Sequence, residues 1–582
     1  MGHGHHHHHG HAHDHDHDHD HRHDHDPETG PLPAALDTTV PDSELSPDQL
    51  SRRTMLRRAG LLGAGVAGAS VLGSSAFQAA AAAPGTRPTG NHGNGNGRGN
   101  RRMLWLAGDH HIHTQYSSDA QYRVADQVRN GARYGLDWMV ITDHGSLNHS
   151  RIGVEKVNPD IKAARESFPD TLVFQGLEWN IPAAEHATVF VHPGKNEVDV
   201  LKRFEIGYDG SVNNASADTP ENEALAISGL DFLAEQVQRR KVKDALMLAN
   251  HPSRKGIDSP HEIRAWRDAQ PTIAVGMEGA PGHQAAGIAE PGGPGGGRGY
   301  YDSSPGAGSF PAYPAESYRT WGGFDWMTAT VGGLWDSLLA EGKPWWISAN
   351  SDSHSNYADT ATRPADTDFD RDGYHGDPVY SGGLNLDAGD YWPGQYSRTH
   401  VGATGFSYAA VMEGIRDGRV WVDHGGLISG LDAQLRGGNR SATLGGTLQV
   451  RRGTEVELRL EIALANGANW AGFVPTLARV DVIRGEVTGE ARDRDGFRAP
   501  GTKVAKSFEV NRSTGSVTLT YRLGKVDRPL YVRVRGTDGN RSQVGLHGAA
   551  TDPHGPALDV VGDADPWRDL WFYANPIWVL PS

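Results

Sequence analysis

Between residues 104 and 354, seven short apolar segments alternate with stretches of helical periodicity. In chain order the apolar segments are LWLAG, DWMVIT, TLVFQGLEW, HATVFVH, ALMLANH, IAVGMEG and PWWISANSDSH. Strand-length apolar runs that alternate with amphipathic helices indicate βα units and a parallel sheet. Seven such strands favour a closed or nearly closed barrel over an open doubly wound sheet, and no Gly-x-Gly-x-x-Gly turn in this range supports a dinucleotide-binding fold.

Polar residues that can bind metal stand at the carboxyl ends of these predicted strands. They are Asp109, His110, His111 and His113 after the first strand, then Asp143, His144, Glu178, His251, Asp352 and His354. A parallel barrel gathers the carboxyl ends of its strands at one mouth, where ligands bind. The sequence therefore predicts that these distant side chains converge on one polar site.

The first strand ends in a His-x-His pair. Because His111 and His113 are separated by one residue, both side chains point to the same face of an extended strand, whereas His110 points to the other face. Imidazole and carboxylate groups without thiolate suit zinc, manganese or iron, and the chain has no cysteine. There are more candidate ligands than one tetrahedral ion can use, so two or three ions are expected.

The motifs DHHIHTQYSSDA, ITDHG, GLEWN, ANHP and SANSDSH, in this order, resemble those of the polymerase and histidinol phosphatase (PHP) family. The resemblance covers Trp105 to Val422. It implies an α/β fold, a distorted seven-stranded β/α (TIM-like) barrel, with three divalent metal ions. The ligands that it implies are His111, His113, Asp119, His144, Glu178, His186, His251, Asp352 and His354.

The same resemblance distributes these ligands over three ions. Glu178 would bridge the first and second ions. The first would also be held by His111, His113 and Asp352, the second by His186 and His251, and the third by Asp119, His144 and His354.

Two of these assignments have alternatives. Asp119 comes one residue later after His113 than in the commonest form of the motif, and a solvated turn residue is the other interpretation. His192, at the other end of the same strand, competes with His186.

Clustered divalent ions lower the pKa of a bound water toward 7 and stabilise the oxyanion of an in-line displacement, so no protein nucleophile is required. We therefore expect metal-dependent hydrolysis of a phosphomono- or phosphodiester, with Glu178, His251 and Asp352 as catalytic residues.

Three further residues are candidates for substrate binding. Arg254 and Lys255, in NHPSRKG, could hold a phosphate by charge-assisted hydrogen bonds, or they could form a solvated basic loop. His283 has no motif support, and a surface or hydrogen-bonding role is open for it, but it follows the strand IAVGMEG and could reach the substrate.

Two other functions stay open. A branch of secreted PHP-like hydrolases that includes carbaryl hydrolases has similar motifs and attacks carbamate or carboxyl esters, which need the same activated water and oxyanion stabilisation. A secreted protein that binds metal or glycans without turnover is the second alternative, although a complete ligand set argues against it. For the phosphoesterase and for the ester hydrolase, the partner is a small-molecule phosphoester or ester.

Two long insertions flank the expected mouth, at residues 281–325 and 355–400. Both are rich in Gly, Pro, Tyr and Asp, and structureless loops of this length are usually lids or binding loops. Three histidines without motif support are expected to have surface or hydrogen-bonding roles: His149, His261 and His375.

The second insertion contains DTDFDRDG, a weak candidate for a calcium site over residues 366–379. Asp368, Asp370 and Asp372 resemble the start of a calcium loop, but Val379 stands where a bidentate glutamate is expected.

From about Gly426 the sequence pattern changes. Alternating segments such as TEVELRLEIAL, LARVDVIRG, GSVTLTYRL and PLYVRVRG recur between Gly, Asn and Asp turns, and helical periodicity disappears. This predicts a β-sandwich over residues 426–582. The segment SYAAVMEGIRDGRVWV, just before it, is expected to supply the helix and strand that finish the barrel, residues 103–425.

The N-terminal region divides into three expected parts. Residues 1–50 begin with histidines that alternate with Gly or Asp, which cannot form a core and are expected to be disordered; a natural metal-gathering tract and an engineered tag are both open. Residues 51–84, with SRRTMLRR before a short apolar run, resemble a twin-arginine signal peptide, and residues 85–102 are a linker. We expect export by the twin-arginine machinery to a secreted or cell-envelope location.

Composition limits the remaining classes of partner. The formal net charge of -16 at pH 7 argues against a basic nucleic-acid-binding surface. The apolar part of the signal region is too short to predict a membrane span in the mature form. Without cysteine an exported protein cannot use disulfides, so its stability must come from core burial and from bound metal.

Overall fold

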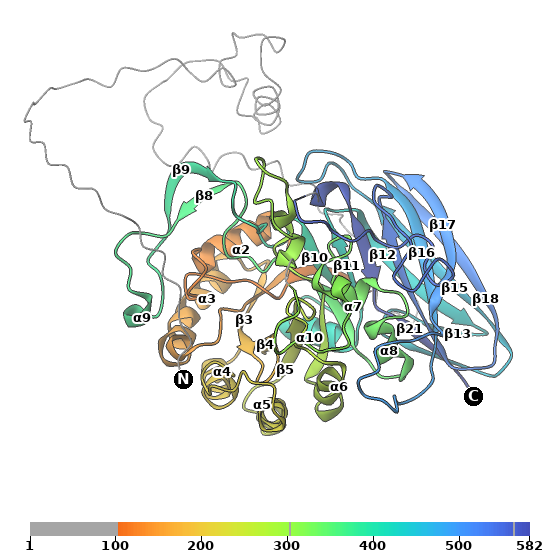
Figure 1. The fold of residues 1–582 in the computed structure, drawn as a ribbon, viewed down its shortest axis with the longest axis horizontal. Coiled ribbons are helices and arrows are strands. Elements are labelled where there is room, and N and C mark those ends of the chain that lie inside the picture. The colour runs from red at the N-terminus through yellow and green to blue at the C-terminus, as the bar shows by residue number, and fades with distance from the viewer. Residues whose placement is uncertain (1–102, 302–303, 563–564) are drawn as a thin grey trace, which may run out of the picture. The chain divides into compact units, whose positions relative to one another are not determined.

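The computed structural model describes residues 103–301, 304–562 and 565–582 (Figure 1). The predicted histidine tract, twin-arginine signal peptide and linker all lie in residues 1–102, outside the described residues. Within the described ranges, no helix has both the length and the apolar character needed to cross a membrane.

The seven predicted strands all form, and they are hydrogen-bonded in chain order within one sheet. Their bounds are β1 Leu104–Asp109, β2 Trp138–Ile141, β3 Leu172–Asn180, β4 His186–Val191, β5 Ala245–Asn250, β6 Ala274–Ala280 and β7 Trp346–Ala349. Every residue of β2, β5, β6 and β7 is buried. Burial of both faces explains why these strands are continuous apolar runs rather than alternating ones.

The prediction of an all-parallel sheet is wrong for β4. This strand pairs antiparallel with both β3 and β5, while the other neighbours among β1–β7 are parallel. Residues 181–185 alone join β3 to β4, whereas a parallel crossover needs a dozen residues or more. The resulting hairpin pairs His186, the first residue of β4, with Asn180, and so places it near Glu178.

The ring of strands closes only partly. β7 lies at one end of the sheet order, and in the described residues an isolated parallel bridge between Ile112 and Ser353 links it to β1. Two backbone hydrogen bonds flank the bridge, from His113 N to Ser353 O at 3.1 Å and from Asp352 N to His111 O at 2.9 Å. The link lies just beyond the carboxyl ends of both strands, so it joins two segments that carry predicted ligands. A fully closed barrel stays a prediction.

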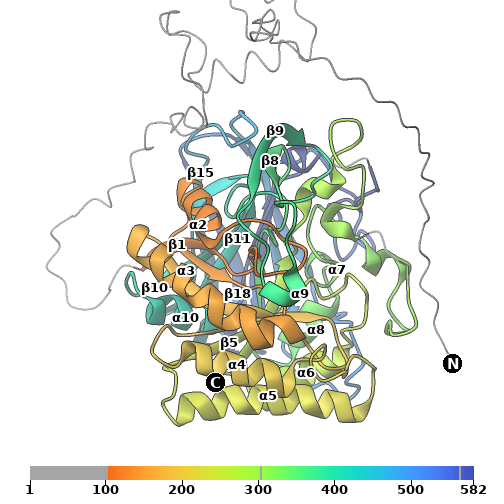
Figure 2. The same cartoon turned by 90° about the vertical axis from the view of Figure 1, so that its left-hand side faces the viewer.

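Most of the helices lie against the outside of these strands, whereas the short helix at residues 369–372 lies in the insertion at residues 355–400 (Figures 1 and 2). Their bounds are α2 Val124–Arg133, α3 Val154–Ser167, α4 Glu197–Tyr208, α5 Pro220–Gln238, α6 Pro260–Ala269, α7 Trp326–Ala329, α8 Leu334–Ala340, α9 Phe369–Asp372 and α10 Tyr408–Arg416. The sequence predicted one helix where α7 and α8 are separate. Gly332 between them has φ of 76°, a left-handed conformation that ends a helix.

The insertion at residues 355–400 is not structureless, contrary to the prediction. It contains the hairpin of β8 (Asp359–Thr362) and β9 (Val379–Asn385), with α9 between them, and the start of β10 (Ser397–Ala403). β10 pairs antiparallel with β1 and so covers the edge that β7 leaves open. β11 (Val420–His424), predicted to finish the barrel, pairs with β10 instead of closing onto β7.

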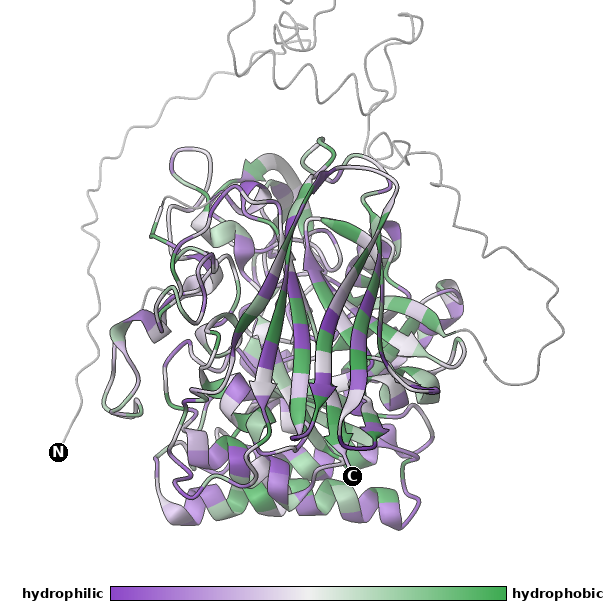
Figure 3. Cartoon of the chain, turned by 90° about the vertical axis from the view of Figure 1, so that its right-hand side faces the viewer, coloured by the Kyte–Doolittle hydropathy of each residue, from purple (hydrophilic) through white to green (hydrophobic). Residues whose placement is uncertain are grey.

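The C-terminal part is built of strands, as its alternation predicted. Their bounds are β12 Ile428–Gly437, β13 Arg440–Ala442, β14 Thr447–Val450, β15 Thr454–Leu464, β16 Leu477–Glu486, β17 Lys503–Arg512, β18 Ser516–Val526, β19 Leu530–Thr537, β20 Trp571–Ala574 and β21 Ile577–Pro581. β12, β13, β15 and β18 form a four-stranded sheet, along which hydrophilic and hydrophobic residues alternate (Figure 3). Its inward side chains share a core with β16, β19 and β21, through residues such as Leu458, Val482 and Val532.

The predicted boundary at residue 425 does not separate the sheets. β20 pairs antiparallel with β11, and β19, β20 and β21 belong to the same sheet as β1–β7. Side chains add to this connection, because Asn575 Oδ1 accepts a hydrogen bond from the backbone N–H of Ile347 on β7 at 3.0 Å. The last strands of the chain therefore complete the sheet that carries the predicted site.

Candidate metal centre

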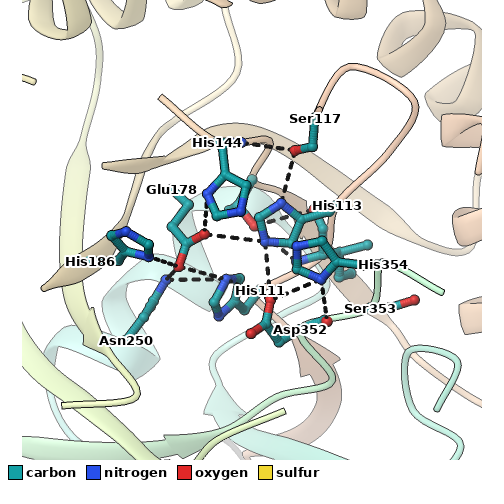
Figure 4. Close-up of polar contacts among 12 residues, drawn as sticks. His111, His113, Ser117, His144, Glu178, His186, Asn250, Asp352, Ser353 and His354 are labelled. Carbon is teal, nitrogen blue, oxygen red and sulfur yellow. Dashed lines mark hydrogen bonds and ion pairs between the residues drawn. The ribbon is translucent and has the colours of Figure 1, made fainter. Parts of the chain in front are cut away.

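The predicted ligands converge on one cavity of about 530 Å³ (Figure 4). Seven of the nine line it: Asp119, His144, Glu178, His186, His251, Asp352 and His354. The other two, His111 and His113, are fully buried beside Glu178 and Asp352. The carboxyl ends of the parallel strands thus meet as the barrel pattern predicted, together with the amino end of the antiparallel β4.

The first group of ligand atoms lies between Glu178 and Asp352. His111 Nε2 is 3.1 Å from Glu178 Oε1 and 3.1 Å from Asp352 Oδ1. His113 Nε2 is 3.1 Å from the same Asp352 oxygen and 3.4 Å from Glu178 Oε2. His110 points away from this group, as the strand alternation predicted, and its Nε2 lies 2.7 Å from Ser348 Oγ. The four side chains that do cluster could hold one ion: His111, His113, Glu178 and Asp352.

Glu178 also contacts a second group. His186 Nδ1 and His251 Nε2 lie 3.0 Å and 3.1 Å from Glu178 Oε1. The other ring nitrogen of His251, Nδ1, lies 3.5 Å from Glu185 Oε1. Because one carboxylate contacts both groups, Glu178 can bridge two ions.

The third group lies on a more exposed side of the cavity. Asp119, whose side chain is 51% exposed, places Oδ2 at 3.0 Å from His144 Nε2 and 3.5 Å from His354 Nε2. One ligand atom from each of these residues and from His113 lies within 4.8 Å of the others. The structure therefore brings Asp119 to the cluster despite the extra residue in its motif.

Two of the ligands have a left-handed backbone, which is costly for residues with a Cβ atom. The φ angle is 29° at His251 and 47° at Asp352. Their backbone N–H groups are held in place, by Glu278 Oε2 at 2.8 Å for His251 and by the carbonyl oxygen of His111 at 2.9 Å for Asp352. Such strain persists where surrounding contacts enforce it, and it gathers at functional sites.

Three buried atoms at the centre of the cluster have no hydrogen-bond partner among the described residues: His113 Nε2, Glu178 Oε2 and Asp352 Oδ1. An unsatisfied buried polar atom costs about 1–3 kcal/mol. Carboxylate oxygens and imidazole nitrogens that crowd together without hydrogen-bond partners are suited to a divalent cation. The residues present therefore fit the predicted metal ions.

For Glu178 and His251, the surroundings favour the forms of the side chains that bind metal. Burial opposes ionisation of Glu178, but the neighbouring imidazoles of His186 and His111 outweigh it and lower the pKa of Glu178 well below its usual value. Burial, together with the positive charge of Arg254, lowers the pKa of His251 to about 4. An ionised carboxylate and a neutral imidazole are the states that metal ions require.

Two carboxylates that the sequence analysis missed hold ligands in place. Glu278 Oε1 accepts a hydrogen bond from His111 Nδ1 at 2.8 Å, and Asp390 Oδ2 accepts one from the backbone N–H of His354 at 2.6 Å. Glu278 stands at the end of a predicted strand, so the rule that found the other ligands could have found it. Asp390 lies in the second insertion, where no pattern marks it.

The three predicted substrate-binding residues lie differently relative to the cavity. Arg254 lines it, and its Nη2 donates to Glu185 Oε1 at 2.8 Å. Lys255 Nζ donates to the other oxygen of Glu185 at 3.0 Å, with its side chain 52% exposed. His283 lines the cavity, with Nε2 at 2.8 Å from Asp352 Oδ2.

His192 lies beyond the opposite end of β4 from His186, and its Nδ1 lies 2.8 Å from the carbonyl oxygen of Pro193. The structure therefore brings His186, and not His192, to the cluster. The histidines without motif support contact other groups: His149 lies 2.9 Å from Glu205, His261 lies 2.5 Å from Asp495, and His375 lies 2.9 Å from the carbonyl oxygen of Ser118.

In the candidate calcium loop, an arginine lies among the acidic side chains. Arg371 Nη2 is 2.6 Å from Asp372 Oδ2, and Arg371 Nη1 is 3.8 Å from Asp368 Oδ2. Asp370 Oδ1 accepts a hydrogen bond from Asn148 at 2.7 Å. A guanidinium already balances these carboxylates, so the arrangement gives calcium no support, and the site stays a prediction.

Comparison with known proteins agrees with the family suggested by the motifs. Residues 109–251 match the model of the PHP domain, a range that includes the predicted ligands from His111 to His251. Asp352 and His354 lie beyond the matched range. No curated protein matches the chain.

One solved structure to which the chain is similar is a two-domain protein containing a predicted PHP-like metal-dependent phosphoesterase, from Bacteroides vulgatus. The two are 14% identical, and the similarity covers 78% of this chain and 94% of the other. The TM-score is 0.29, at which the likeness carries no argument about fold or site.

Proposed function

We propose that this protein is a metal-dependent phosphoesterase that cleaves phosphomono- or phosphodiesters with three divalent ions. The observation that carries the proposal is the environment of Glu178. Ring nitrogens of five histidines lie within 3.4 Å of its carboxylate: His111, His113, His144, His186 and His251. So many ligand atoms around one buried anion are suited to bridging cations.

The three groups of side chains would each hold one ion, with Glu178 shared by the first two. Zinc, manganese and iron all suit these nitrogen and oxygen ligands. When bound, such ions supply an activated water and stabilise charge that develops on the substrate.

The substrate class is argued from the charge that faces the cavity. Arg254 places a permanently charged guanidinium at the cavity wall and keeps it there through Glu185. A fixed cation beside a metal cluster is suited to the nonbridging oxygens of a phosphoester. Lys255 is more exposed and pairs with the same Glu185, so we propose a smaller contribution from it. His283 also faces the cavity, where it contacts Asp352, and it completes the proposed substrate-binding set.

A substrate panel tests this proposal. The full chain, loaded with Zn²⁺ or Mn²⁺, is assayed on bis(p-nitrophenyl) phosphate, p-nitrophenyl phosphate and 1-naphthyl methylcarbamate. We expect phosphoester hydrolysis, and Arg254→Gln should raise KM for phosphoesters more than Lys255→Gln does. A preference for the carbamate would replace the phosphoesterase by an ester hydrolase, and turnover of none of the three by a fully loaded protein would favour a binding protein.

We also propose that the strands of residues 426–582 form a β-sandwich and that residues 51–84 direct export through the twin-arginine machinery. The export signal is tested by replacing Arg52 and Arg53 with lysine and following the protein by cell fractionation. Loss of the exported form is expected, and unchanged export would contradict this proposal.

A further inference from the structure

Glu278, near the end of β6, contacts predicted ligands of two proposed ion positions although it is not one of the nine predicted ligands. Its side chain is fully buried. Oε1 accepts hydrogen bonds from His111 Nδ1 at 2.8 Å and from Asn350 Nδ2 at 3.0 Å. Oε2 accepts one from the backbone N–H of His251 at 2.8 Å. One carboxylate is thus connected to the first ligand group and to the second.

The contact with His111 decides which ring nitrogen faces the cluster. An ionised carboxylate only accepts hydrogen bonds, so the hydrogen of a neutral His111 must lie on Nδ1. The lone pair of Nε2 then points toward Glu178 and Asp352, each 3.1 Å away. A carboxylate behind a histidine ligand fixes its tautomer and orientation in this way.

The contact with His251 acts on the backbone. His251 has a left-handed φ of 29°. Without the carboxylate of Glu278, its buried backbone N–H would lose its hydrogen-bond acceptor. This backbone conformation sets where the ring emerges, with Nε2 at 3.1 Å from Glu178 Oε1. Glu278 therefore stabilises the strained backbone that places the ring of His251 beside Glu178.

We propose that Glu278 is a positioning residue shared by two ion positions, and that the ions held by the first and second groups depend on it together while the third does not. The third group, with Asp119, His144 and His354, is held by other contacts, among them the hydrogen bond from the His354 backbone to Asp390. The proposal rests on the metal dependence of the proposed function, but not on which ester is cleaved.

Glu278→Gln tests the proposal because an amide presents an acceptor on one side and a donor on the other, whereas Glu278 meets donors on both sides. If the amide NH₂ faces His111, the ring must move its hydrogen to Nε2, where it blocks metal binding. If the NH₂ faces the N–H of His251, two donors oppose each other. Each orientation disturbs one ligand directly, and Glu178 Oε1, which lies 3.1 Å from both His111 and His251, couples the two positions. We therefore expect metal affinity at the first and second positions to fall about 10- to 100-fold, the usual effect of such outer contacts.

Glu205→Gln is the matched control. Glu205 is also fully buried, and its carboxylate accepts hydrogen bonds from His149 Nδ1 at 2.9 Å and from the backbone N–H of Ser146 at 3.0 Å. The same chemical exchange is therefore made at a carboxylate–imidazole pair outside the nine ligands. We expect this variant to keep all three ions.

Metal occupancy is measured on crystals of the full chain equilibrated with graded Mn²⁺ concentrations. Anomalous difference density assigns each ion to its position, so the histidines of residues 1–26 do not enter the count. In Glu278→Gln, the first and second positions should empty at concentrations that leave the third filled, and excess Mn²⁺ should refill them. Hydrolysis is recorded separately, so a chain that loads metal as expected but cleaves no phosphoester would contradict the proposed function alone.

Unchanged occupancy at the first two positions, or equal weakening of all three, would overturn the proposal. Glu278→Asp is the second variant, because it keeps two acceptor oxygens but shortens the side chain by one methylene. It too should weaken the first two positions. If neither variant folds while Glu205→Gln does, Glu278 builds the fold rather than positioning ligands, and the proposal is wrong.

Discussion

Glu178 shows at the scale of one residue how a buried charge can be tolerated in this protein. A carboxylate removed from water is costly unless hydrogen bonds or opposite charges replace its hydration. Asn250 Nδ2 donates to Glu178 Oε1 at 3.1 Å, but Oε2 has no hydrogen-bond partner among the described residues. The side chain is therefore placed for binding cations rather than for stabilising the fold by itself.

Asp352→Ala should abolish the first ion position. The substitution removes the oxygen that lies 3.1 Å from both His111 and His113. We expect hydrolysis to fall by more than about 100-fold, because a change of about 100-fold is the upper range for residues that only hydrogen-bond to a metal ligand. Bound metal and the hydrolysis rate are measured together. Asp370→Ala, on the surface helix α9, serves as control and should keep both.

His186→Ala and His192→Ala form a pair that separates the two candidates on β4. His186 contacts Glu178 at 3.0 Å, whereas His192 contacts the carbonyl of its neighbour Pro193. We expect the first substitution to lower both metal content and activity and the second to change activity less than about twofold. A larger loss in His192→Ala would mean that the ligand assignment on this strand is reversed.

At the scale of elements, the β3–β4 hairpin is the feature that most changes the site. Reversal of β4 brings its first residue, His186, to the mouth, where a parallel β4 would have placed its last residues. His192 follows that strand end, so the correct ligand depends on strand direction. The direction in turn follows from the short connection of residues 181–185.

Helix α6 carries a pH-dependent contribution to stability. Ser259 and Glu262 form a capping box at its start, and burial raises the pKa of Glu262 from 4.5 to about 7 against the opposing hydrogen bonds from Ser259. The folded chain thus keeps a proton that the unfolded chain releases near pH 4.5. This contribution is fully present below pH 4.5 and is lost as the pH rises to about 7.

Glu262→Gln should therefore gain stability relative to the natural chain as the pH rises from 4.5 to 7. Free energies of unfolding in urea, measured across this range, give the difference. Glu235→Gln, on α5, where the side chain is 44% exposed, corrects for the general effect of removing one carboxylate. A difference that stays constant with pH, or moves the other way, would show that Glu262 does not titrate as its burial indicates.

At the scale of the whole molecule, the C-terminal strands and the metal-binding part share one sheet. β20 covers β11, and buried ion pairs cross between the two parts, including Arg533 with Asp336 at 2.7 Å and Arg298 with Asp569 at 3.1 Å. Removing one partner of a buried pair typically costs about 3–5 kcal/mol. The loss of several pairs together would exceed the stability of an ordinary domain.

A chain that ends at residue 425 should therefore fail to fold. We expect little soluble protein and no cooperative thermal transition by circular dichroism. A chain that lacks residues 1–100, which precede the first strand β1, is the control and should fold. A soluble and active truncation at residue 425 would show that the shared sheet is dispensable.

Strand positions and candidate ligands could be predicted from the sequence, because both depend on local pattern. Apolar runs mark strands wherever both faces are buried, and polar residues that interrupt them at the carboxyl end reveal the mouth. The His-x-His pair even fixed which of three neighbouring histidines would face away. The later strands of the C-terminal part were visible for the same reason, as alternation with period two.

Features that depend on contacts between distant segments could be seen only in the folded chain. The direction of β4, the return of β20 to β11 and the pairing of β10 with β1 are long-range choices that no local period encodes. The roles of Glu278 and Asp390 likewise come from partners far along the chain, because a carboxylate becomes a positioning group through the side chain or N–H that it meets. The local pattern indicates which chemistry a residue can supply, and the tertiary structure determines which group that residue contacts.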